Sequence, residues 1–251
     1  MDLRRIAPSS RVSEYGEKSV EEKPIPSEGL SIWLDASNAA SYPGSGTAWT
    51  DLSGNENNFS WNTNPSFTTG SAPYFNTNGY FATGPASNSV GINNTSGYTV
   101  MALAYVNYNV QTGAFKFFSS NASSGSGTRG IFSHLPWNNA NVYFDQGGCC
   151  GPDTRTVAAS GGSQAWVLWT FRGQANNSTR NIIKNNTILA TNANAAANIN
   201  LNSTGIRINN TVEYGSTWNA KLGAFIAYNR NLTDNEVSEI YNYYKPLYGL
   251  A

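Results

Sequence analysis

The sequence predicts an all-β protein: an antiparallel β-sandwich with one short C-terminal helix and an extended N-terminal arm. Short runs of β-branched and aromatic residues recur, with turn signals about every dozen residues. Helical spacing is convincing only near the C-terminus. The chain has 251 residues and few charges, 12% in all, and an all-β sandwich often reaches this size as one domain. We therefore expect a single large domain.

Two blocks of sequence bracket the expected sandwich. The first, residues 30–58, reads LSIWLDASNAASYPGSGTAWTDLSGNENN, and the second, residues 222–244, reads LGAFIAYNRNLTDNEVSEIYNYY. The first resembles the opening strand and long loop of the concanavalin A-like, laminin-G-like jelly rolls, and the second resembles their last core strand and terminal helix. The resemblance covers residues 30–251 and implies the same fold. It does not fix an activity, because these sandwiches serve as lectins, glycosidases, adhesion modules and virion parts.

Charge and hydropathy narrow the expected partners. The formal net charge is zero, and no basic run lies in the expected sandwich, so we expect neither nucleic acid nor an anionic membrane as a partner. No run approaches the roughly 18 apolar residues of a membrane span. The N-terminus also lacks the apolar run of a secretory signal. We expect no signal peptide and no transmembrane segment.

Residues 1–29 form a polar segment of their own. Eleven of the chain's 15 basic and 15 acidic residues fall within the first 28 positions, and Pro24 and Pro26 stiffen its exit. One interpretation is a mobile leader, because short polar termini usually stay mobile. The other is an assembly arm that lies on a neighbouring subunit. The candidate contact residues of this arm are Arg4, Arg5, Arg11 and Tyr15.

Local patterns place the main strands. Residues 98–106, YTVMALAYV, are almost all apolar, which suits a central strand covered on both faces. Residues 166–171, WVLWTF, are similar. Residues 182–189 suit two short strands around Asn185 and Asn186, which tolerate the positive φ of a tight turn. The pair Asn78 and Gly79 predicts a second hairpin.

The expected helix follows residue 232. Thr233 and Glu236 have the spacing of a capping box, and Pro246 is expected to end the helix. Its apolar residues recur three and four positions apart, which predicts a face that docks on the sandwich. These residues are Val237, Ile240, Tyr241 and Tyr244.

Catalytic signatures are weak. Glycoside hydrolases need two carboxyl groups beside the scissile bond, and the Glu-x-Asp-x-x-Glu strand motif of sandwich-fold glucanases does not occur. The sole histidine, His134, has no nucleophile motif around it, and we interpret it as a loop residue with satisfied hydrogen bonds. We therefore expect no enzymatic activity. The glutamates of the folded region are Glu56, Glu213, Glu236 and Glu239.

Calcium is the one cofactor hypothesis. Jelly rolls of this type hold calcium with loop aspartates and backbone carbonyls, and the DLSGNENN loop makes Asp51 the strongest candidate. The alternative is structural, because loop Asp and Asn residues usually bond their own backbone. Otherwise we expect no cofactor. The aspartates considered are Asp35, Asp51, Asp145 and Asp153.

Residues 131–155, IFSHLPWNNANVYFDQGGCCGPDTR, form a second unusual block. Similar blocks, with a Pro-Trp turn, a Val-Tyr-Phe-Asp strand, a Gly-Cys loop and a following Arg, occur in some laminin-G-like proteins of viral and environmental origin. Cys149 and Cys150 are the only cysteines. A bond between adjacent cysteines closes no long loop, so we expect two free thiols. Two adjacent cysteines with one distant histidine lack zinc-ligand spacing.

Tryptophans beside asparagines are the candidate glycan-binding residues, because sugar rings stack on aromatic faces. Trp61, Trp137 and Trp218 have such neighbours, although most tryptophans of a sandwich lie in its core. Trp137 is the preferred candidate. The expected binding residues are Trp137, Asn138, Asp145 and Arg155.

Three function classes fit the sequence. The first is a non-enzymatic virion structural protein, a capsid decoration or a tail or fibre component, of bacteriophage type. Residues 1–29 would bind other virion proteins, and the lectin-like sandwich would face outward toward host-surface glycans. The second is a cellular carbohydrate-binding or adhesion module, and the third a glycoside hydrolase. Homo-oligomers are common, but the sequence does not fix an oligomeric state.

Overall fold

The computed structural model describes residues 23–106, 114–115, 130–137, 139–148, 150–161, 164–194, 198–199, 201–209 and 220–251, with the backbone alone for 114, 115 and 177. Short strands dominate this part of the chain, as expected. The strands are β1 Leu30–Asp35, β2 Ala48–Trp49, β3 Phe59–Trp61, β4 Ser66–Thr68, β5 Tyr74–Asn76, β6 Ala82–Ala86, β7 Tyr98–Val106, β8 Ala114–Phe115, β9 Ile131–His134, β10 Asn141–Gln146, β11 Arg155–Ala159, β12 Trp166–Gly173, β13 Arg180–Lys184, β14 Thr187–Asn192, β15 Gly205–Ile208 and β16 Ala220–Tyr228. The helical segments are the 3-10 turns η1 Ser87–Ser89 and η2 Ala175–Asn177 and the α-helix α1 Asp234–Tyr248.

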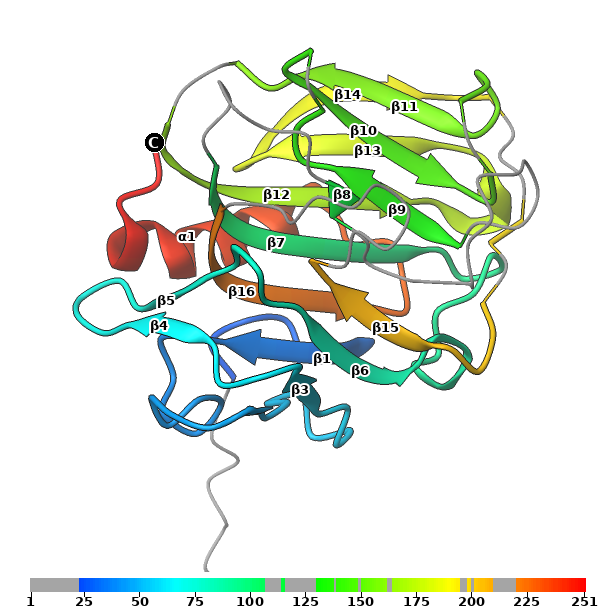
Figure 1. Cartoon of the computed structure of the whole chain (residues 1–251). Helices are drawn as coiled ribbons and strands as arrows, with labels where there is room; N and C mark the ends of the chain where they lie inside the picture. The colour runs from blue at the N-terminus through cyan, green and yellow to red at the C-terminus, as the bar shows by residue number, and fades with distance from the viewer. Residues whose placement is uncertain are drawn as a thin grey trace, which may run out of the picture.

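Three antiparallel sheets build the sandwich. The large sheet has the order β14-β13-β12-β7-β16-β5-β4, and β1 pairs with the rest of β16. Two four-stranded sheets, β11-β10-β9-β8 and β15-β6-β3-β2, cover one face of the large sheet. Helix α1 lies against its other face (Figure 1). The predicted antiparallel β-sandwich with one C-terminal helix is therefore confirmed.

Strand β7 is the central strand of the molecule, as predicted. It pairs with β12 on one side, where Phe171 opposes Val100, and with β16 on the other, where Ile226 opposes Met101. Successive side chains of a strand point to opposite faces. Val100 accordingly packs between the sheets, whereas Met101 packs toward the helix.

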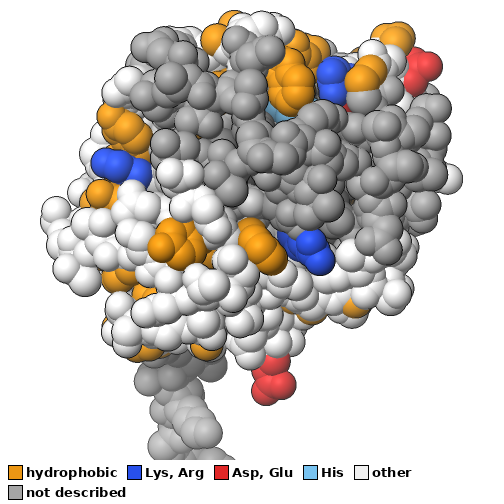
Figure 2. Space-filling view, viewed as in Figure 1, with side chains coloured by type: hydrophobic (Ala, Val, Ile, Leu, Met, Phe, Trp, Pro, Cys, Tyr) orange, Lys and Arg blue, Asp and Glu red, His pale blue; other side chains and the backbone are white. Residues whose placement is uncertain are grey.

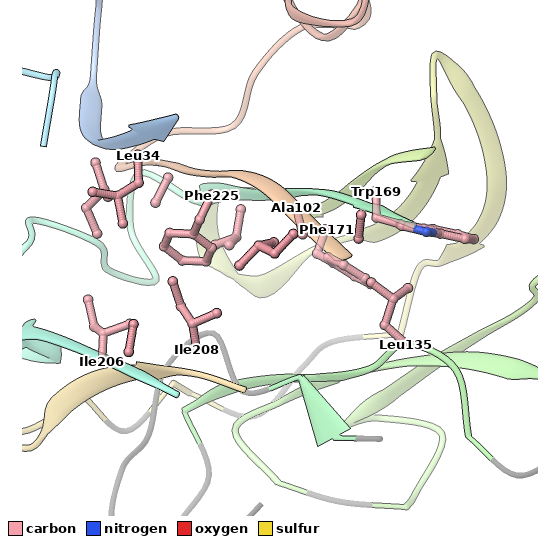
Figure 3. Close-up of a cluster of buried hydrophobic side chains, with 14 of the residues drawn as sticks. Leu34, Ala102, Leu135, Trp169, Phe171, Ile206, Ile208 and Phe225 are labelled. Carbon is pink, nitrogen blue, oxygen red and sulfur yellow. The ribbon is translucent and has the colours of Figure 1, made fainter. Parts of the chain in front are cut away.

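The main core fills the space between the large sheet and the two small ones. Figure 3 shows Phe225 and Phe171 of the large sheet facing Ile208 of β15 and Leu135 after β9. Aromatic rings close one end of this core. Trp61 is 2% exposed, and its ring stacks on Trp49 at a centroid distance of 5.6 Å. Trp61 is thus a core residue and not a ligand platform, which corrects its candidacy for glycan binding.

Helix α1 begins with the predicted capping box. The Thr233 hydroxyl accepts from the backbone N–H of Glu236, and the Glu236 carboxylate accepts from the backbone N–H of Thr233 at 2.8 Å. The expected apolar face is buried. Pro246 does not end the helix: it lies in the last turn, where one lost hydrogen bond is tolerated, and Gly249 ends the helix at φ 64°. Among the helices of the described residues, none is long and apolar enough to cross a bilayer.

The two predicted hairpins have different outcomes. Asn185 has φ 58° and lies in the turn between the paired strands β13 and β14, as predicted. Asn78 and Gly79 also form a turn, but the hairpin prediction is wrong, because β5 pairs with β4 and β16 whereas β6 pairs with β3 and β15. This turn carries the chain from one layer to the other.

Residues 23–29, the end of the expected arm, pack on the sandwich itself. Ile25 is 3% exposed and belongs to the core under the helix. The Pro26 carbonyl accepts from the Tyr228 hydroxyl at 2.9 Å, and the Glu28 carbonyl accepts from Arg230 Nε at 2.8 Å. Residues 23–29 therefore belong to the sandwich and not to the arm. The arm residues Arg4, Arg5, Arg11 and Tyr15 lie outside the described residues.

Candidate functional site

Asp145 and Arg155 form an ion pair on the sheet of β8 to β11. They lie opposite one another in the pairing of β10 with β11, so their side chains leave the same face of this sheet. Arg155 Nε donates to Asp145 Oδ1 at 2.6 Å, and Nη2 donates to Oδ2 at 2.7 Å. Asp145 is fully buried, whereas the side chain of Arg155 is 19% exposed. A bidentate pair of this kind fixes the plane of the guanidinium.

Aromatic rings extend this ion pair across the sheet. The guanidinium carbon of Arg155 lies 4.6 Å from the centroid of the Tyr143 ring. The Tyr143 and His134 rings are 6.0 Å apart, and the His134 and Trp137 rings are 4.5 Å apart. We call these five residues, His134, Trp137, Tyr143, Asp145 and Arg155, the aromatic face. Figure 2 shows hydrophobic side chains beside a basic one at the upper end of the view, where Figure 1 places β10 and β11.

Trp137 lies in a hydrogen-bonded turn between β9 and β10. Its N–H donates to the Asn141 carbonyl at 2.8 Å, and its carbonyl accepts from the Ala140 N–H at 2.9 Å. Asn139 donates through Nδ2 to the Tyr143 hydroxyl at 2.6 Å. The rings of Trp137 and Tyr143 are both partly exposed. The turn therefore holds an indole and a phenol at the rim of one sheet.

The structure brings together three of the four predicted glycan-binding residues. Trp137, Asp145 and Arg155 belong to the aromatic face, and Asn138 lies outside the described residues. Trp218, a weaker candidate, also lies outside them. The predicted set omits Tyr143, although this residue lies two positions before Asp145 and so on the same side of the strand. His134 was expected in a loop, which is wrong: it is the last residue of β9 and is 2% exposed.

Asp51 has a structural role at the edge of β1. Its Oδ1 accepts from the backbone N–H groups of Trp33 at 2.8 Å and Ser53 at 2.9 Å. Its Oδ2 accepts from the Ser53 hydroxyl at 2.6 Å and the Asn57 N–H at 3.0 Å. Both oxygens are thus engaged by donors, which argues against the calcium hypothesis. Among the described residues, no three His, Cys, Asp or Glu side chains group as metal ligands would.

Neighbours of Asp51 complete the closure of this edge. The Ser31 carbonyl accepts from the Ser53 hydroxyl at 3.1 Å and from Asn57 Nδ2 at 2.8 Å. Asn55 Nδ2 donates to the Leu30 carbonyl at 2.8 Å. Polar side chains of the loop thereby occupy backbone groups to which another strand could pair, one of the ways in which proteins protect edge strands.

The free-thiol prediction is wrong for Cys150, which is disulfide-bonded. The only other cysteine of the chain is Cys149, which lies outside the described residues. Cys150 has φ 76°, an unusual conformation for a residue other than glycine.

The carboxylates of the described residues do not present a hydrolytic pair. Glu236 is bound by Arg230, whose Nη1 and Nη2 donate to it at 3.0 and 2.5 Å, and this hydrogen bonding lowers the pKa of Glu236 to about 2. Burial raises the pKa of Asp35 above its ordinary value. Asp35 is fully buried under α1, however, and a substrate could not reach it. Glu213 lies outside the described residues.

Comparison with known proteins supports the fold alone. No family model and no curated protein matches the chain. Solved structures match it at low identity. The binding domain of Paraclostridial Mosquitocidal Protein 1 has a TM-score of 0.64 at 16% identity, over 88% of this chain and 55% of that one.

Two further structures have similar scores. The binding domain of botulinum neurotoxin DC, in complex with rat synaptotagmin II, has a TM-score of 0.63 at 11% identity, over 86% of this chain and 51% of that one. Trypanosoma rangeli sialidase has a TM-score of 0.59 at 12% identity, over 89% of this chain and 34% of that one. The present chain thus spans about half or less of each of these three chains.

Proposed function

We propose that this protein is a non-enzymatic binding module that recognises a glycan through the aromatic face. The observation that carries the proposal is the continuous contact from Trp137 through His134 and Tyr143 to Arg155. Partly exposed rings offer apolar surfaces for the C–H side of a sugar, and polar groups at their rim can bond its hydroxyls. The two toxin binding domains among the similar structures support a binding role by analogy of fold only.

The geometry suits a neutral or acidic sugar. Arg155 is held in plane by Asp145 and stacks on Tyr143, so its orientation is set before a ligand arrives. A preorganised site loses less side-chain entropy on binding. The Tyr143 hydroxyl accepts from Asn139, which leaves its hydrogen to donate to a ligand.

The first experiment is a glycan array followed by calorimetry on the full chain. Trp137→Ala should abolish binding while leaving the melting temperature nearly unchanged, because the indole is partly exposed. Trp166→Ala is the matched control: Trp166 is also partly exposed, but it packs on Tyr248 with ring centroids 4.7 Å apart. Its loss should leave glycan binding intact.

Two results would overturn the proposal. One is wild-type affinity in a folded Trp137→Ala protein. The other is the absence of binding to any glycan of a broad panel. Turnover of a glycan would favour the hydrolase alternative instead.

The location of this module is a separate proposal, supported by the sequence resemblance and by the charged N-terminus. We place the module on the outer surface of a virion, attached to capsid or tail proteins through residues 1–22. The alternative is a cellular adhesion module. Mass spectrometry of purified particles tests this: enrichment at high copy number over the soluble lysate supports the virion, and absence from particles rejects it.

A further inference from the structure

A cavity of about 560 Å³ lies where β1 begins and β16 ends. Four separate segments line it: residues 27–31, the 53–57 loop, residues 89–91 at the end of η1, and Asn229 after β16. In Figure 1, β1 lies at the lower side of the molecule and β10 and β11 at the upper side. The cavity is therefore distinct from the aromatic face.

The lining of this cavity is polar but uncharged. Serines, asparagines and glycines contribute most of it, with Leu30 and Val90 as the apolar members. None of the described lining residues is charged. Nearby, the Arg230 guanidinium is paired with Glu236, and Lys23 Nζ donates to the carbonyl of Ser53, a lining residue. An anionic ligand would find no cation among the described lining residues to pair with.

Backbone hydrogen bonds hold Asn229 in place and leave its side-chain amide available to a ligand. Its N–H donates to the Gly29 carbonyl at 2.9 Å, and its carbonyl accepts from the Ser96 hydroxyl at 2.9 Å. Within the described residues, its side-chain amide makes no hydrogen bond to the protein. The backbone thus fixes an amide that can both donate to and accept from a ligand.

Two glycines keep space beside this amide. A Cβ at Gly29 would lie 2.8 Å from Asn229 Oδ1, and a Cβ at Gly91 would lie 3.0 Å from Asn229 Nδ2. Both glycines have positive φ, 69° and 74°, a conformation that other residues rarely adopt. Any larger side chain at either position would crowd the Asn229 amide.

Asn55 and Asn57 add acceptors to the same cavity. Their Nδ2 groups donate to the backbone of β1, which orients both side chains. Neither side-chain oxygen accepts a hydrogen bond from a residue that the structure describes. The cavity therefore combines oriented amide oxygens, a complete amide and serine hydroxyls.

We propose that this cavity is a second binding site, specific for a neutral saccharide unit. Its size lies in the range of small-ligand sites, and its neutral donors and acceptors match a ring of hydroxyl groups. None of the described lining residues is aromatic, so hydrogen bonds carry the binding. Together with the aromatic face it would let one molecule hold two glycan chains, which raises the overall avidity without any new contact.

The test uses the uniformly ¹⁵N-labelled full chain. Galactose, N-acetylglucosamine, lactose and maltose are the neutral probes, and glucuronic acid is the charged comparison. The side-chain amide signal of Asn229 is identified by its absence from Asn229→Ala. A neutral probe should shift this signal, whereas glucuronic acid should not. Asn229→Ala should weaken that binding about tenfold, as expected for one or two lost hydrogen bonds.

Two variants separate this site from the aromatic face. Trp137→Ala should leave the Asn229 shifts unchanged, so that failure of the glycan function proposed above does not affect this result. Ser27→Trp should block the cavity from an exposed position, which keeps the test valid if Asn229→Ala folds poorly. The proposal fails if no neutral probe moves the Asn229 signal, or if Ser27→Trp binds as the wild type does.

Discussion

Tyr244 connects α1 to β1 through buried hydrogen bonds, and its replacement by phenylalanine is the sharpest test of the fold. Trp33 Nε1 donates to the Tyr244 hydroxyl at 3.0 Å, and this hydroxyl donates to Asp35 Oδ2 at 3.0 Å. All three residues are buried. Tyr244→Phe keeps the ring but deprives both the indole N–H and the carboxylate oxygen of this partner.

The expected loss of unfolding free energy follows from these two groups. Each buried polar group left unsatisfied costs about 1–3 kcal/mol, so the variant should lose about 2–6 kcal/mol. For a chain of this size that is a fall in melting temperature of roughly 4–24 °C. Urea unfolding followed by tryptophan fluorescence measures the loss directly.

Tyr243→Phe is the matched control on the next residue of the helix. Tyr243 is half-buried, and within the described residues its hydroxyl makes no hydrogen bond, so this change should cost less than about 0.5 kcal/mol. If Tyr244→Phe lost no more stability than Tyr243→Phe, the buried network would not stabilise the junction between helix and sheet.

The same variant has a defined pH dependence. Burial raises the pKa of Asp35 above 3.8, and the hydrogen bonds from Ser37 and Tyr244 oppose that rise. A raised pKa in the folded state means that this group favours folding at pH below the unfolded value and that this contribution is lost as the pH rises through the folded value. Without the Tyr244 hydroxyl the pKa rises further. The stability gap between wild type and Tyr244→Phe should therefore narrow on acidification, and a gap that widened would contradict this sign.

Three shorter predictions concern other parts of the molecule. Glu236→Gln should cost about 1 kcal/mol at neutral pH, after discounting for solvent screening. The Arg230 hydrogen bond lowers the Glu236 pKa from 4.5 to about 2, so the melting temperatures of the two proteins should converge as the pH falls through this range, and a constant difference would refute the assignment. Gly84→Ala should lose about 1–3 kcal/mol in urea unfolding, because its Cβ would lie 2.3 Å from the Phe59 ring; an unchanged midpoint would contradict that packing. Excess calcium should leave the melting temperature unchanged relative to chelator, because donors engage both Asp51 oxygens, and a clear rise would revive the calcium hypothesis.

Much of the fold could be predicted because its signals are local. The run at residues 98–106 and the capping box at Thr233 contain what is needed to identify a buried strand and a helix start. The turn at Asn78 and Gly79 shows what local signals cannot predict, namely which strands pair. A hairpin and a crossing between layers begin with the same residues, and the pairing of Phe75 with Leu222, far along the chain, decides between them.

The aromatic face and the polar cavity also differ in how far local sequence determines them. The aromatic face comes from one contiguous block, since β9, β10 and β11 are consecutive neighbours in their sheet, and neighbours in sequence stay neighbours in space. Trp137, Asp145 and Arg155 could therefore be chosen together from the sequence. The polar cavity joins residues as distant as Ser27 and Asn229, and no local pattern relates them.

The closure of the β1 edge depends on the chemistry of one side chain as well as on folding. Asn57 protects the Ser31 carbonyl by donating through its amide nitrogen. Hydrolysis of that amide, a common reaction of ageing proteins, would replace the donor with a carboxylate, which can only accept. Two acceptors would then face each other, and the Ser31 carbonyl would keep only its longer hydrogen bonds, from the Ser53 hydroxyl at 3.1 Å and Asn55 Nδ2 at 3.3 Å. The edge of β1 would be less well protected against a strand of another copy, and an old molecule would become more prone to aggregation while it is still folded.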